Sequence, residues 1–510
     1  MKQNWRLVGF ILAFEILIGI AATGSARAQQ PMAANSGAKS GGDAERLAAL
    51  EEKIKVMEKR LEFLESMLAQ SAASLVASNG AISATALGIQ TRPSVLSAVA
   101  GSLPSSPLQS ASPQVPAAPF VSAGPEGFSM QSPDGDFRLG IRYQVQADGR
   151  FAVNRNEEAD PNSFYLRRTQ PILTGTLYRR FNFHVLTDFS LGRPRVNDAY
   201  IDTIISPALK VRVGKFKGPV GIERLRSGTA LPLMERALPT QLVPNRDIGF
   251  QLSGDLADGR LSYAVGVFDG VPDGSSTDGN TDDHKDLDGH LMLQPFVKTS
   301  FTSLAGLSVG VGGSYGDVEG SPSFTNLPVY SSVGQREFFE YRSDGTLAGT
   351  VVAKGIHYRL SPQGTYYAGP FGLMSEYVQS VQEVRRGSAS ATMNHASWQL
   401  MTSYVLTGEN GSYAGVNPAK PFDPAVGNWG AFEVATRYAS LSADQEAFPL
   451  FADPGKSARQ AKAWSLGLNW YLNRNVKLVF AYEQTDFEGA APGVTFDTEK
   501  LFQQRFQLRF

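Results

Sequence analysis

The residues with the clearest chemical potential in this chain are cations gathered in one segment, 215–246. Only two acidic residues, Glu223 and Glu235, accompany them there. An arginine guanidinium presents a planar fork of donors that fits an oxyanion, and a lysine ammonium acts as a point charge. The residue types therefore favour a site that attracts anions. The cations of the segment are Lys215, Lys217, Arg224, Arg226, Arg236 and Arg246.

The rest of the chain offers little for catalysis or metal binding. It contains no cysteine, its five histidines show no metal-ligand spacing beyond the acidic stretch 273–290, and no serine lies in a nucleophile-elbow motif. The acidic stretch 273–290 has oxygen ligands suited to calcium, but it lacks the spaced aspartates and closing glutamate of an EF-hand loop. We interpret it as a solvated outer loop. We therefore expect no enzyme activity, no cofactor and no metal.

Segment 215–246 follows a short alternating stretch, 209–214, and its glycines and prolines prevent it from continuing as a strand. A loop of this length in a strand-rich domain is usually functional or disordered. Its many apolar residues, among them Val220, Leu233 and Leu238, argue against disorder. We predict that the segment is a constriction loop folded into the interior of the domain.

The N-terminus has the features of a secretion signal. Lys2 and Arg6 precede an apolar stretch, and residues 26–28 form a small-x-small cleavage site, so we predict removal of residues 1–28. No other run approaches the ~18 apolar residues of a membrane-spanning helix. The formal charge of −1 argues against nucleic-acid binding. The protein is predicted to be exported, and any insertion into a membrane must use strands.

Three segments are predicted between the signal and the strand-rich domain. Residues 29–43 are small and polar and should be flexible. Residues 44–70 carry apolar residues at heptad spacing, which indicates a coiled coil that allows a trimer; a lone amphipathic helix is the alternative. Residues 71–126 have the Ala-, Ser- and Pro-rich composition of a linker. The strand-rich domain is therefore expected to comprise residues 127–510.

Apolar and polar residues alternate over long strands in this domain. The pattern runs from Phe137 to Asp148 and returns at 502–510, and residues 464–482 have the pattern of a hairpin. Strands of nine or more residues with aromatic residues near their ends are typical of a transmembrane barrel, whereas a soluble sandwich has shorter strands. The sequence therefore predicts an all-β fold, an antiparallel transmembrane barrel of about 16 strands.

The lengths of the connections predict the end of the barrel at which each lies. In this count segment 215–246 follows the fifth strand on the external side, from which it can enter the lumen. The long segment 408–428 falls on the periplasmic side and fits that side poorly. Periplasmic turns are expected at 179–182, 206–208, 257–259 and 473–475, and external loops at 153–163, 268–289, 316–350 and 441–460.

Several stretches resemble the phosphate-selective porin family of the O and P type, in order from about Arg138 to Phe510. The resemblance implies an outer-membrane barrel of about sixteen strands, usually trimeric, in contact with lipid and lipopolysaccharide. It also implies a narrow cationic pore that passes small anions, such as phosphate or polyphosphate. The stretches are FYLRRTQPILTGTLYRRFNF from Phe164, VGKFKGPVGIERL from Val213, LPLMERALP from Leu231, PNRDIGFQLSG from Pro244, YVLTGE from Tyr404 and NWGAFEVATRYASL from Asn428.

The resemblance adds two site residues, because the family's paired arginines in the second strand correspond to Arg167 and Arg168. Alternation places Arg168 on the lumen face, whereas Arg167 could face the pore only above the membrane band or beside a bulge. Lys215 has the same difficulty, so the strand before it must end or twist. The predicted anion path consists of Arg167, Arg168, Lys215, Lys217, Arg224, Arg226 and Arg236.

Three alternatives to an anion-selective channel stay open. Asp188, Asp198 and Asp202 could oppose the arginines in a weakly selective general-diffusion pore, since every porin lumen is polar. The coiled coil and linker could instead make the chain a structural tether between the outer membrane and peptidoglycan. Some barrels are hydrolases, although no motif supports that here. The favoured interpretation is a passive channel for small anions in a Gram-negative outer membrane, with the N-terminal region in the periplasm.

Overall fold

The computed structural model describes residues 119–153, 162–279 and 282–510. The predicted signal peptide, the segment 29–43, the predicted coiled coil and most of the predicted linker lie outside these ranges. Within the described ranges, no helix is long and apolar enough to cross a membrane.

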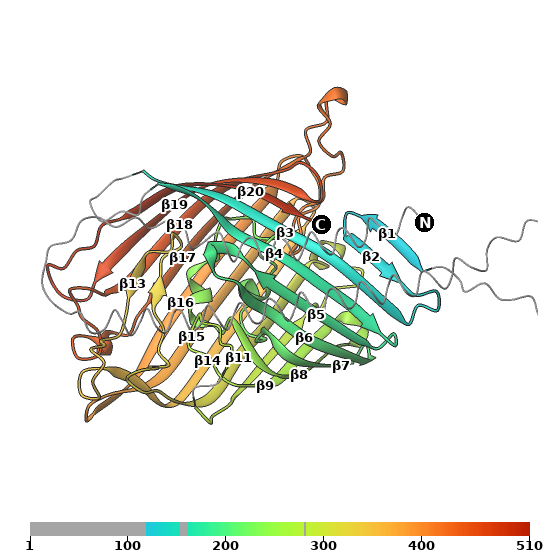
Figure 1. Ribbon diagram of the computed structural model, residues 1–510. Coiled ribbons are helices and arrows are strands. Elements are labelled where there is room, and N and C mark those ends of the chain that lie inside the picture. The colour runs from blue at the N-terminus through green and yellow to red at the C-terminus, as the bar shows by residue number, and fades with distance from the viewer. Residues whose placement is uncertain (1–118, 154–161, 280–281) are drawn as a thin grey trace, which may run out of the picture. The chain divides into compact units, whose positions relative to one another are not determined.

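Sixteen antiparallel strands form a closed barrel (Figure 1). Successive barrel strands pair with one another, and β20 returns to pair with β3, so the sheet closes on itself. This confirms the predicted all-β barrel of about 16 strands. The strands are β3 (Phe137–Ala152), β4 (Ser163–Leu177), β5 (Phe181–Asp188), β6 (Arg195–Ser206), β7 (Leu209–Lys217), β8 (Arg246–Leu256), β9 (Leu261–Phe268), β10 (Asp286–Leu293), β11 (Leu307–Glu319), β14 (Val351–Ala368), β15 (Phe371–Arg386), β16 (Ala389–Val405), β17 (Ala431–Ser442), β18 (Ala458–Tyr471), β19 (Val476–Gly489) and β20 (Glu499–Arg509).

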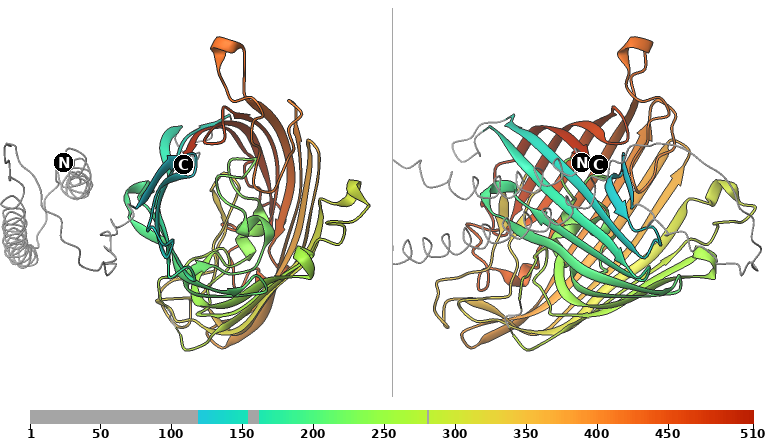
Figure 2. Two further views of the ribbon diagram at one scale, coloured as in Figure 1. Left: turned by 90° about the vertical axis from the view of Figure 1, so that its right-hand side faces the viewer. Right: turned by 45° about the vertical axis from the view of Figure 1, so that its right-hand side comes forward.

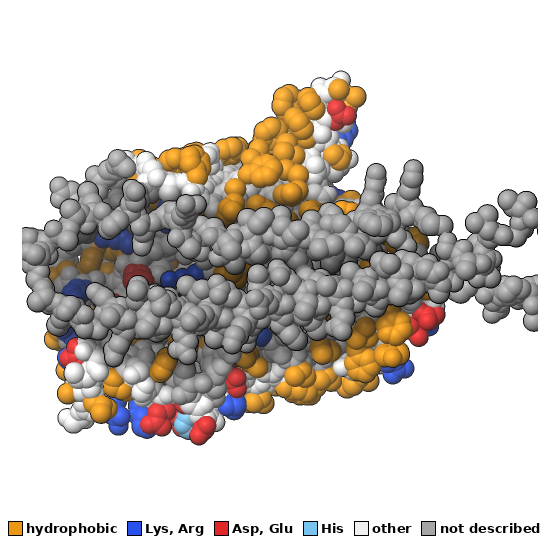
Figure 3. All heavy atoms as spheres, viewed as in Figure 1, with side chains coloured by type: hydrophobic (Ala, Val, Ile, Leu, Met, Phe, Trp, Pro, Cys, Tyr) orange, Lys and Arg blue, Asp and Glu red, His pale blue; other side chains and the backbone are white. Residues whose placement is uncertain are grey.

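The outer face of the barrel is apolar because the predicted alternation holds along the strands. On β18, Trp464, Leu466 and Leu468 are exposed, while Ser465 and Gly467 between them are buried. Hydrophobic side chains form large patches on the parts of the wall that are visible above and below the grey atoms (Figure 3). An apolar band of this kind faces lipid in outer-membrane barrels.

The two ends of the barrel differ in the lengths of their connections. Those after β4, β6, β8, β14 and β18 are short and define the turn end, whereas most connections at the opposite, loop end are longer. The predicted turns and external loops lie at these two ends as expected. The β16–β17 connection, residues 406–430, lies at the turn end and projects from the barrel (Figure 1). The predicted strand count therefore assigned this connection to the correct end of the barrel. Its length is unusual for that end.

The inside of the barrel is not polar throughout, although the alternation suggested a polar lumen. Tyr330 and Phe339 come from the β11–β14 connection, which contains β12 (Tyr330–Ser331) and β13 (Glu337–Phe339), and both are buried. They belong to one apolar cluster with residues of the β7–β8 connection and with Val378 of β15 and Ala439 of β17. Inward apolar side chains on these strands thus face a protein core inside the barrel rather than water.

The sheet begins before the predicted boundary at residue 127. β1 (Phe120–Gly124) and β2 (Gly127–Gln131) form a hairpin, and β2 pairs with β3. Since β20 pairs with β3 only as far as Gln144, the hairpin occupies the edge of β3 that the end of the chain leaves open. The linker predicted at 71–126 is therefore wrong over its last residues. Backbone hydrogen bonds to β3 hold the β1–β2 hairpin in place. The composition of the segment did not reveal this pairing.

Candidate functional site

The connection between β7 and β8 forms an inner loop, residues 218–245, that lies within the barrel (Figure 2). It contains one helical turn, α3 (Ile222–Leu225), and a 3-10 turn, η3 (Leu238–Leu242). Most of its apolar side chains are buried, and Met234 packs against Val479 on the inner face of β19. The structure thus places the loop inside the barrel, as its composition predicted.

Side chains of the wall satisfy the backbone of the inner loop. An irregular loop inside a barrel carries carbonyl groups that need donors, because no partner strand reaches them. The donors come from β18, β19 and β20, more than 230 residues further along the chain. They are Asn469 to the oxygen of Pro232 (2.8 Å), Lys477 to Leu231 (2.8 Å), Arg505 to Met234 (2.7 Å) and Gln507 to Thr229 (3.0 Å).

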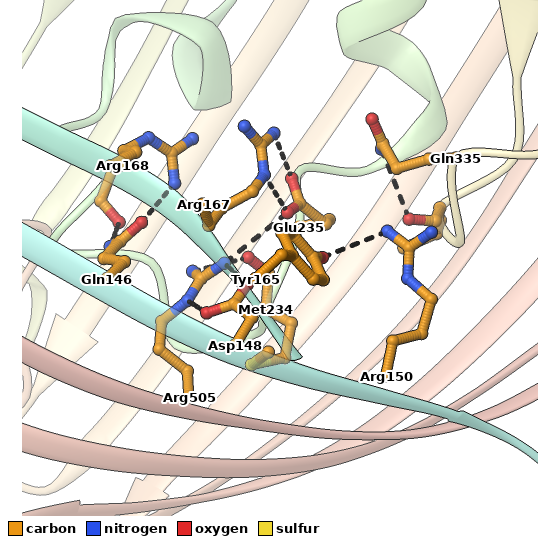
Figure 4. A network of polar contacts seen from close by, with 12 residues as sticks. Gln146, Asp148, Arg150, Tyr165, Arg167, Arg168, Met234, Glu235, Gln335 and Arg505 are labelled. Carbon is orange, nitrogen blue, oxygen red and sulfur yellow. Dashed lines mark hydrogen bonds and ion pairs between the residues drawn. The ribbon is translucent and has the colours of Figure 1, made fainter. Parts of the chain in front are cut away.

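Both acidic residues of the inner loop turn toward the wall. Glu235 accepts two hydrogen bonds from Arg167, at 2.6 and 3.0 Å, and lies 3.5 Å from Arg505 (Figure 4). Glu223 lies 3.4 Å from Arg437 of β17. Glu223 is 1% and Glu235 5% exposed. Their charges are therefore neutralised where the loop meets the wall.

Arg167 keeps the Glu235 carboxyl ionised despite its burial. Burial alone would raise the pKa of this carboxyl, but the charge and hydrogen bonds of Arg167, together with the charge of Arg505, hold the pKa well below its usual range. A depressed pKa adds stability that is present above the unfolded-state pKa and is lost only as pH falls through the folded-state pKa. This anchor of the inner loop therefore persists in mildly acidic media.

A β-bulge in β4 turns two consecutive arginines into the barrel. Arg168 pairs with Gln146 of β3 and the next pair is Leu166 with Ala147, so Arg167 is the extra residue of the bulge. The bulge interrupts the alternation that would otherwise turn Arg167 toward lipid. The sequence analysis named a bulge as one of the conditions under which Arg167 could face the pore. Arg168 donates to the side chain of Gln146 (Figure 4) and takes part in no ion pair among the described residues.

Three cations have the loop's backbone, rather than a carboxylate, as their partner. Lys217 donates to the carbonyl oxygens of Arg224 (2.7 Å) and Arg226 (3.2 Å), and Arg236 donates to those of Glu223 (3.1 Å) and Arg226 (2.6 Å). Arg224 donates to a carbonyl of η3. None of these three cations forms an ion pair in the described part of the chain. All three are half-buried, so part of each side chain remains accessible.

These cations lie close enough to repel one another. Burial, followed by the charges of Arg236 and Arg246, lowers the pKa of Arg224 to about 9. Burial also lowers the pKa of Arg236, with Glu223 opposing the shift and Arg246 adding to it. Arg224 therefore keeps its positive charge at neutral pH. Together these cations form one cation cluster, made of Lys217, Arg224, Arg236 and Arg246.

Arg226 differs from the cations of this cluster because it is only 2% exposed. Its guanidinium donates to the carbonyl oxygen of Ser412 (3.2 Å) and lies 5.2 Å from the ring centre of Tyr413, both in the β16–β17 connection. The predicted path paired Arg226 with Arg224. The structure separates them, and the contacts of Arg226 join the inner loop to the connection at the turn end.

Lys215 also departs from the predicted path. It pairs with Asp278 of the β9–β10 connection, whose side chain is 78% exposed. The preceding residue, Gly214, has a φ of +128°, and a Cβ there would lie 2.2 Å from the oxygen of Ala199. The backbone is thus distorted just before Lys215, as the sequence required, but the side chain turns to the β9–β10 connection instead of joining the cation cluster.

The wall acids that could have balanced the inner loop are paired with arginines of the strands. The contacts are Asp198 with Arg246 (2.9 and 3.1 Å), Asp202 with Arg212 (2.6 and 2.8 Å) and Asp188 with Arg195 (3.7 Å). Only the first of them reaches a member of the cation cluster. In the described ranges, these acids therefore leave Lys217, Arg224 and Arg236 uncompensated.

The acidic stretch 273–290 is only partly the solvated outer loop that we expected. Asp273 is buried and its carboxylate binds Arg359 of β14 at 2.6 Å, and residues from Asp286 onward belong to β10. The inward fold of the β9–β10 connection, which its polar composition did not reveal, explains the difference. Among the residues that the structure describes, no group of three or more His, Asp or Glu side chains could hold a metal ion.

The sequence analysis identified the inner loop and named Arg167, but it missed other residues that hold the loop. Arg437 and Arg505 bind its acids, and Tyr413 donates to the carbonyl oxygen of Ile222. The two arginines occupy inward positions of alternating strands, a signal that could have marked them. Tyr413 lies in an irregular connection, so no local pattern points to it.

Comparisons with known proteins show what this chain is similar to. A family model described as phosphate-selective porin O and P matches residues 137–510. Porin O of Pseudomonas aeruginosa is 24% identical over 377 residues, which are 68% of this chain and 82% of that protein. The outer membrane channel DcaP of Acinetobacter baumannii matches with a TM-score of 0.49 and 10% identity over 74% of this chain and 99% of its own. An anion-selective porin from Comamonas acidovorans matches with a TM-score of 0.45 and 11% identity, over 73% of this chain and 100% of its own.

The anchoring role of Glu235 can be tested with Glu235→Gln. Removing one partner of a buried ion pair leaves the other charge unpaired, so we expect the free energy of unfolding to fall by roughly 3 kcal/mol. The matched control is Glu319→Gln, which breaks the exposed pair of Glu319 with Lys354 and should cost less than about 1 kcal/mol. Denaturant titration of the refolded barrel measures both. Equal losses in the two variants would show that Glu235 does not anchor the loop.

Proposed function

The chain belongs to the phosphate-selective porin O and P family and is an outer-membrane porin, and we propose that it lets small anions diffuse through a constriction at the inner loop. The family consists of channel proteins, which fits the expectation that the chain is not an enzyme. The proposal adds the sign of the permeant ion and the residues that attract it.

The separation of charges on the inner loop carries this proposal. Its two acids, Glu223 and Glu235, are buried and paired with wall arginines. Its cations Arg224 and Arg236 are half-buried and bind only carbonyl oxygens among the described residues. The loop therefore presents net positive charge to any ion that passes it. Fixed charge in a low-dielectric pore concentrates ions of the opposite sign.

The same geometry favours release as well as attraction. Conduction requires each site to hold an ion weakly enough for it to leave. Lys217 already gives two of its donors, and Arg236 two of its five, to the loop backbone. The donors that remain can attract an anion without enclosing it. Burial lowers the pKa of Arg224 only to about 9, so its charge is present throughout the physiological range.

Phosphate is the permeant anion that we propose, and the family description supports it. A planar guanidinium can bond two oxygens of phosphate at once, which a chloride ion cannot exploit. Arg168, Arg224 and Arg236 each retain guanidinium donors that no carboxylate of the described residues occupies. Polyphosphate-like solutes share this chemistry, so they belong to the same proposal.

A weakly selective general-diffusion pore is the second candidate. Asp198 pairs with Arg246 and thereby offsets part of the cation cluster. This candidate predicts an anion-to-cation permeability ratio near one, whereas the first candidate predicts a ratio clearly above one. A structural tether through the coiled coil is the third candidate, and its residues lie outside the described ranges. A tether alone predicts no conductance.

We also propose that the porin is a homotrimer and that residues 44–70 brace it. The heptad spacing supports the brace. Three barrel strands, β5, β9 and β10, have only 8 residues each. Tilted at about 40°, such strands rise only about 20 Å, less than the ~25 Å apolar band of an outer-membrane barrel. A neighbouring subunit could cover this low wall.

Ion selectivity tests the proposed function directly. A unit charge near the ion path contributes roughly 1 kcal/mol in a water-filled pore, or about fivefold in relative permeability. We therefore expect Arg224→Gln combined with Arg236→Gln to lower the anion-to-cation permeability ratio at least about fivefold. Reversal potentials in planar bilayers across a salt gradient measure this ratio. Gln retains donors for the loop carbonyls, so the loop should keep its position.

The matched control for this experiment is Lys215→Gln combined with Asp278→Asn, which removes both charges of an ion pair outside the cation cluster. It should change the permeability ratio by less than about twofold, since the net charge stays the same. Chloride, phosphate and an organic anion compared at equal ionic strength then rank the solutes. A cation-preferring wild-type pore would refute the proposal.

Deleting residues 44–70 tests the brace. A short coiled coil adds association free energy between subunits, so its loss should lower the temperature at which the trimer dissociates, while the barrel stays folded. The measurement is the heating temperature that converts trimer to monomer on unboiled gels. The deletion of an equal length of linker, residues 80–106, is the control and should leave that temperature unchanged. The same dissociation temperature in both deletions would remove the bracing role.

A further inference from the structure

A polar cavity lies at the turn end of the barrel, below the β1–β2 hairpin. Its volume is about 390 Å³, and its lining includes the hairpin turn and the inner faces of β3 to β6. This volume falls within the ~300–1,000 Å³ of ordinary ligand pockets. We call it the exit cavity. Four of its lining side chains matter for its chemistry: Arg138, Arg142, His184 and Tyr200.

The β1–β2 hairpin is built to stay over this cavity. Gly127 has a φ of +93°, and a Cβ at that position would lie 2.3 Å from the oxygen of Ile141, so only glycine fits the close approach to β3. Asn475, in the β18–β19 turn, donates to the oxygen of Pro125 at 2.7 Å. The ring of Phe128 lies 5.9 Å from that of Phe510 at the end of the chain. Contacts on three sides thus fix the hairpin.

On the side of the exit cavity formed by β5 and β6, the lining residues His184 and Tyr200 belong to a stack of planar groups. The guanidinium of Arg212 lies 3.9 Å from the ring centre of Tyr200, and Tyr200 stacks on His184 at 5.1 Å with an angle of 13° between the rings. Two hydrogen bonds to Asp202, at 2.6 and 2.8 Å, hold Arg212 in place. Since its charge is balanced, this wall offers shape and polar edges rather than net charge.

The free positive charge of the exit cavity comes from β3. Arg138 is exposed and takes part in no ion pair among the described residues. Arg142 lies 3.4 Å from Glu126 of the hairpin turn, and its side chain is 45% exposed. The two arginines are four positions apart on one strand, so both belong to its inner face. An anion between them could accept hydrogen bonds from both guanidinium groups.

The carboxylate of Glu126 occupies Arg142 and would compete with a bound anion for it. The side chain of Glu126 is 64% exposed and lies between Arg142 and Arg474. Exposed ion pairs contribute little stability, because water and salt screen both charges. A multiply charged anion can therefore replace the carboxylate at Arg142 without unfolding the hairpin.

We propose that the exit cavity is a second binding site for a phosphate-like oxyanion, in which Arg138 and Arg142 hold the anion and Glu126 is displaced from Arg142. The proposal rests on the proposed function for the supply of the anion, which would arrive from the cation cluster. The exit cavity would provide an intermediate binding site for the anion between the inner loop and the turn end. Two weak sites in series are how a channel combines attraction with fast release.

Calorimetric titration of the full-length protein in detergent with inorganic phosphate tests the site apart from conduction. The titration uses the Arg224→Gln, Arg236→Gln background, in which the cation cluster is weakened. Phosphate binding should persist in this background. Adding Arg138→Gln and Arg142→Gln should raise the Kd at least tenfold, whereas adding Glu126→Gln should lower it about threefold, because the competing carboxylate is gone.

The matched control is Arg180→Gln, which removes an arginine from the β4–β5 turn at the same end of the barrel but outside the lining of the exit cavity. It should leave the Kd within twofold. An equal loss in this control, or no loss with Arg138→Gln and Arg142→Gln, would overturn the exit site. Reversal potentials keep the two proposals distinct. The exit variants should remain anion-selective, and a wild-type pore without anion preference would instead refute the proposed function.

Discussion

The position of the inner loop depends on the neutralisation of two carboxylates inside the barrel. An unpaired buried charge costs several kcal/mol, so Glu223 and Glu235 need the arginines that β4, β17 and β20 supply. With those acids held at the wall, the loop's own cations are left to bind carbonyl oxygens. The accessible positive charge of the loop is therefore a consequence of how the loop is anchored, and the proposed anion preference depends on the same contacts.

The barrel could be predicted from the sequence because its strands obey one local rule. A residue that faces lipid must be apolar, and this fixes the alternation along strands such as β3 and β18 whatever the rest of the chain does. The hairpin β1–β2 obeys no such rule, since its place depends on where β20 ends along β3. The apolar core inside the barrel was missed for a related reason. Val378 faces inward like a lumen residue, and only the inward fold of a distant loop makes it a core residue.

The site was predictable as a segment but not residue by residue. Composition identified the inner loop, and strand parity gave its place after the fifth strand. The partners of each charge are far apart in the sequence, so the sequence could not show that Arg226 is buried beside Tyr413 or that Lys215 pairs with Asp278. Arg167 is the instructive case. Alternation excluded it from the lumen unless a bulge intervened, and a bulge is present.

Exposure separates the acids that fix this structure from the acid that an anion could replace. Glu235 is 5% exposed and its two hydrogen bonds from Arg167 cannot be exchanged for water without cost, so it holds the inner loop. Glu126 is 64% exposed and pairs with Arg142 in contact with solvent, where such a pair contributes about 1 kcal/mol or less. Both are glutamates beside arginines, and composition treats them alike. Burial makes the first pair part of the architecture and leaves the second open to competition from a solute.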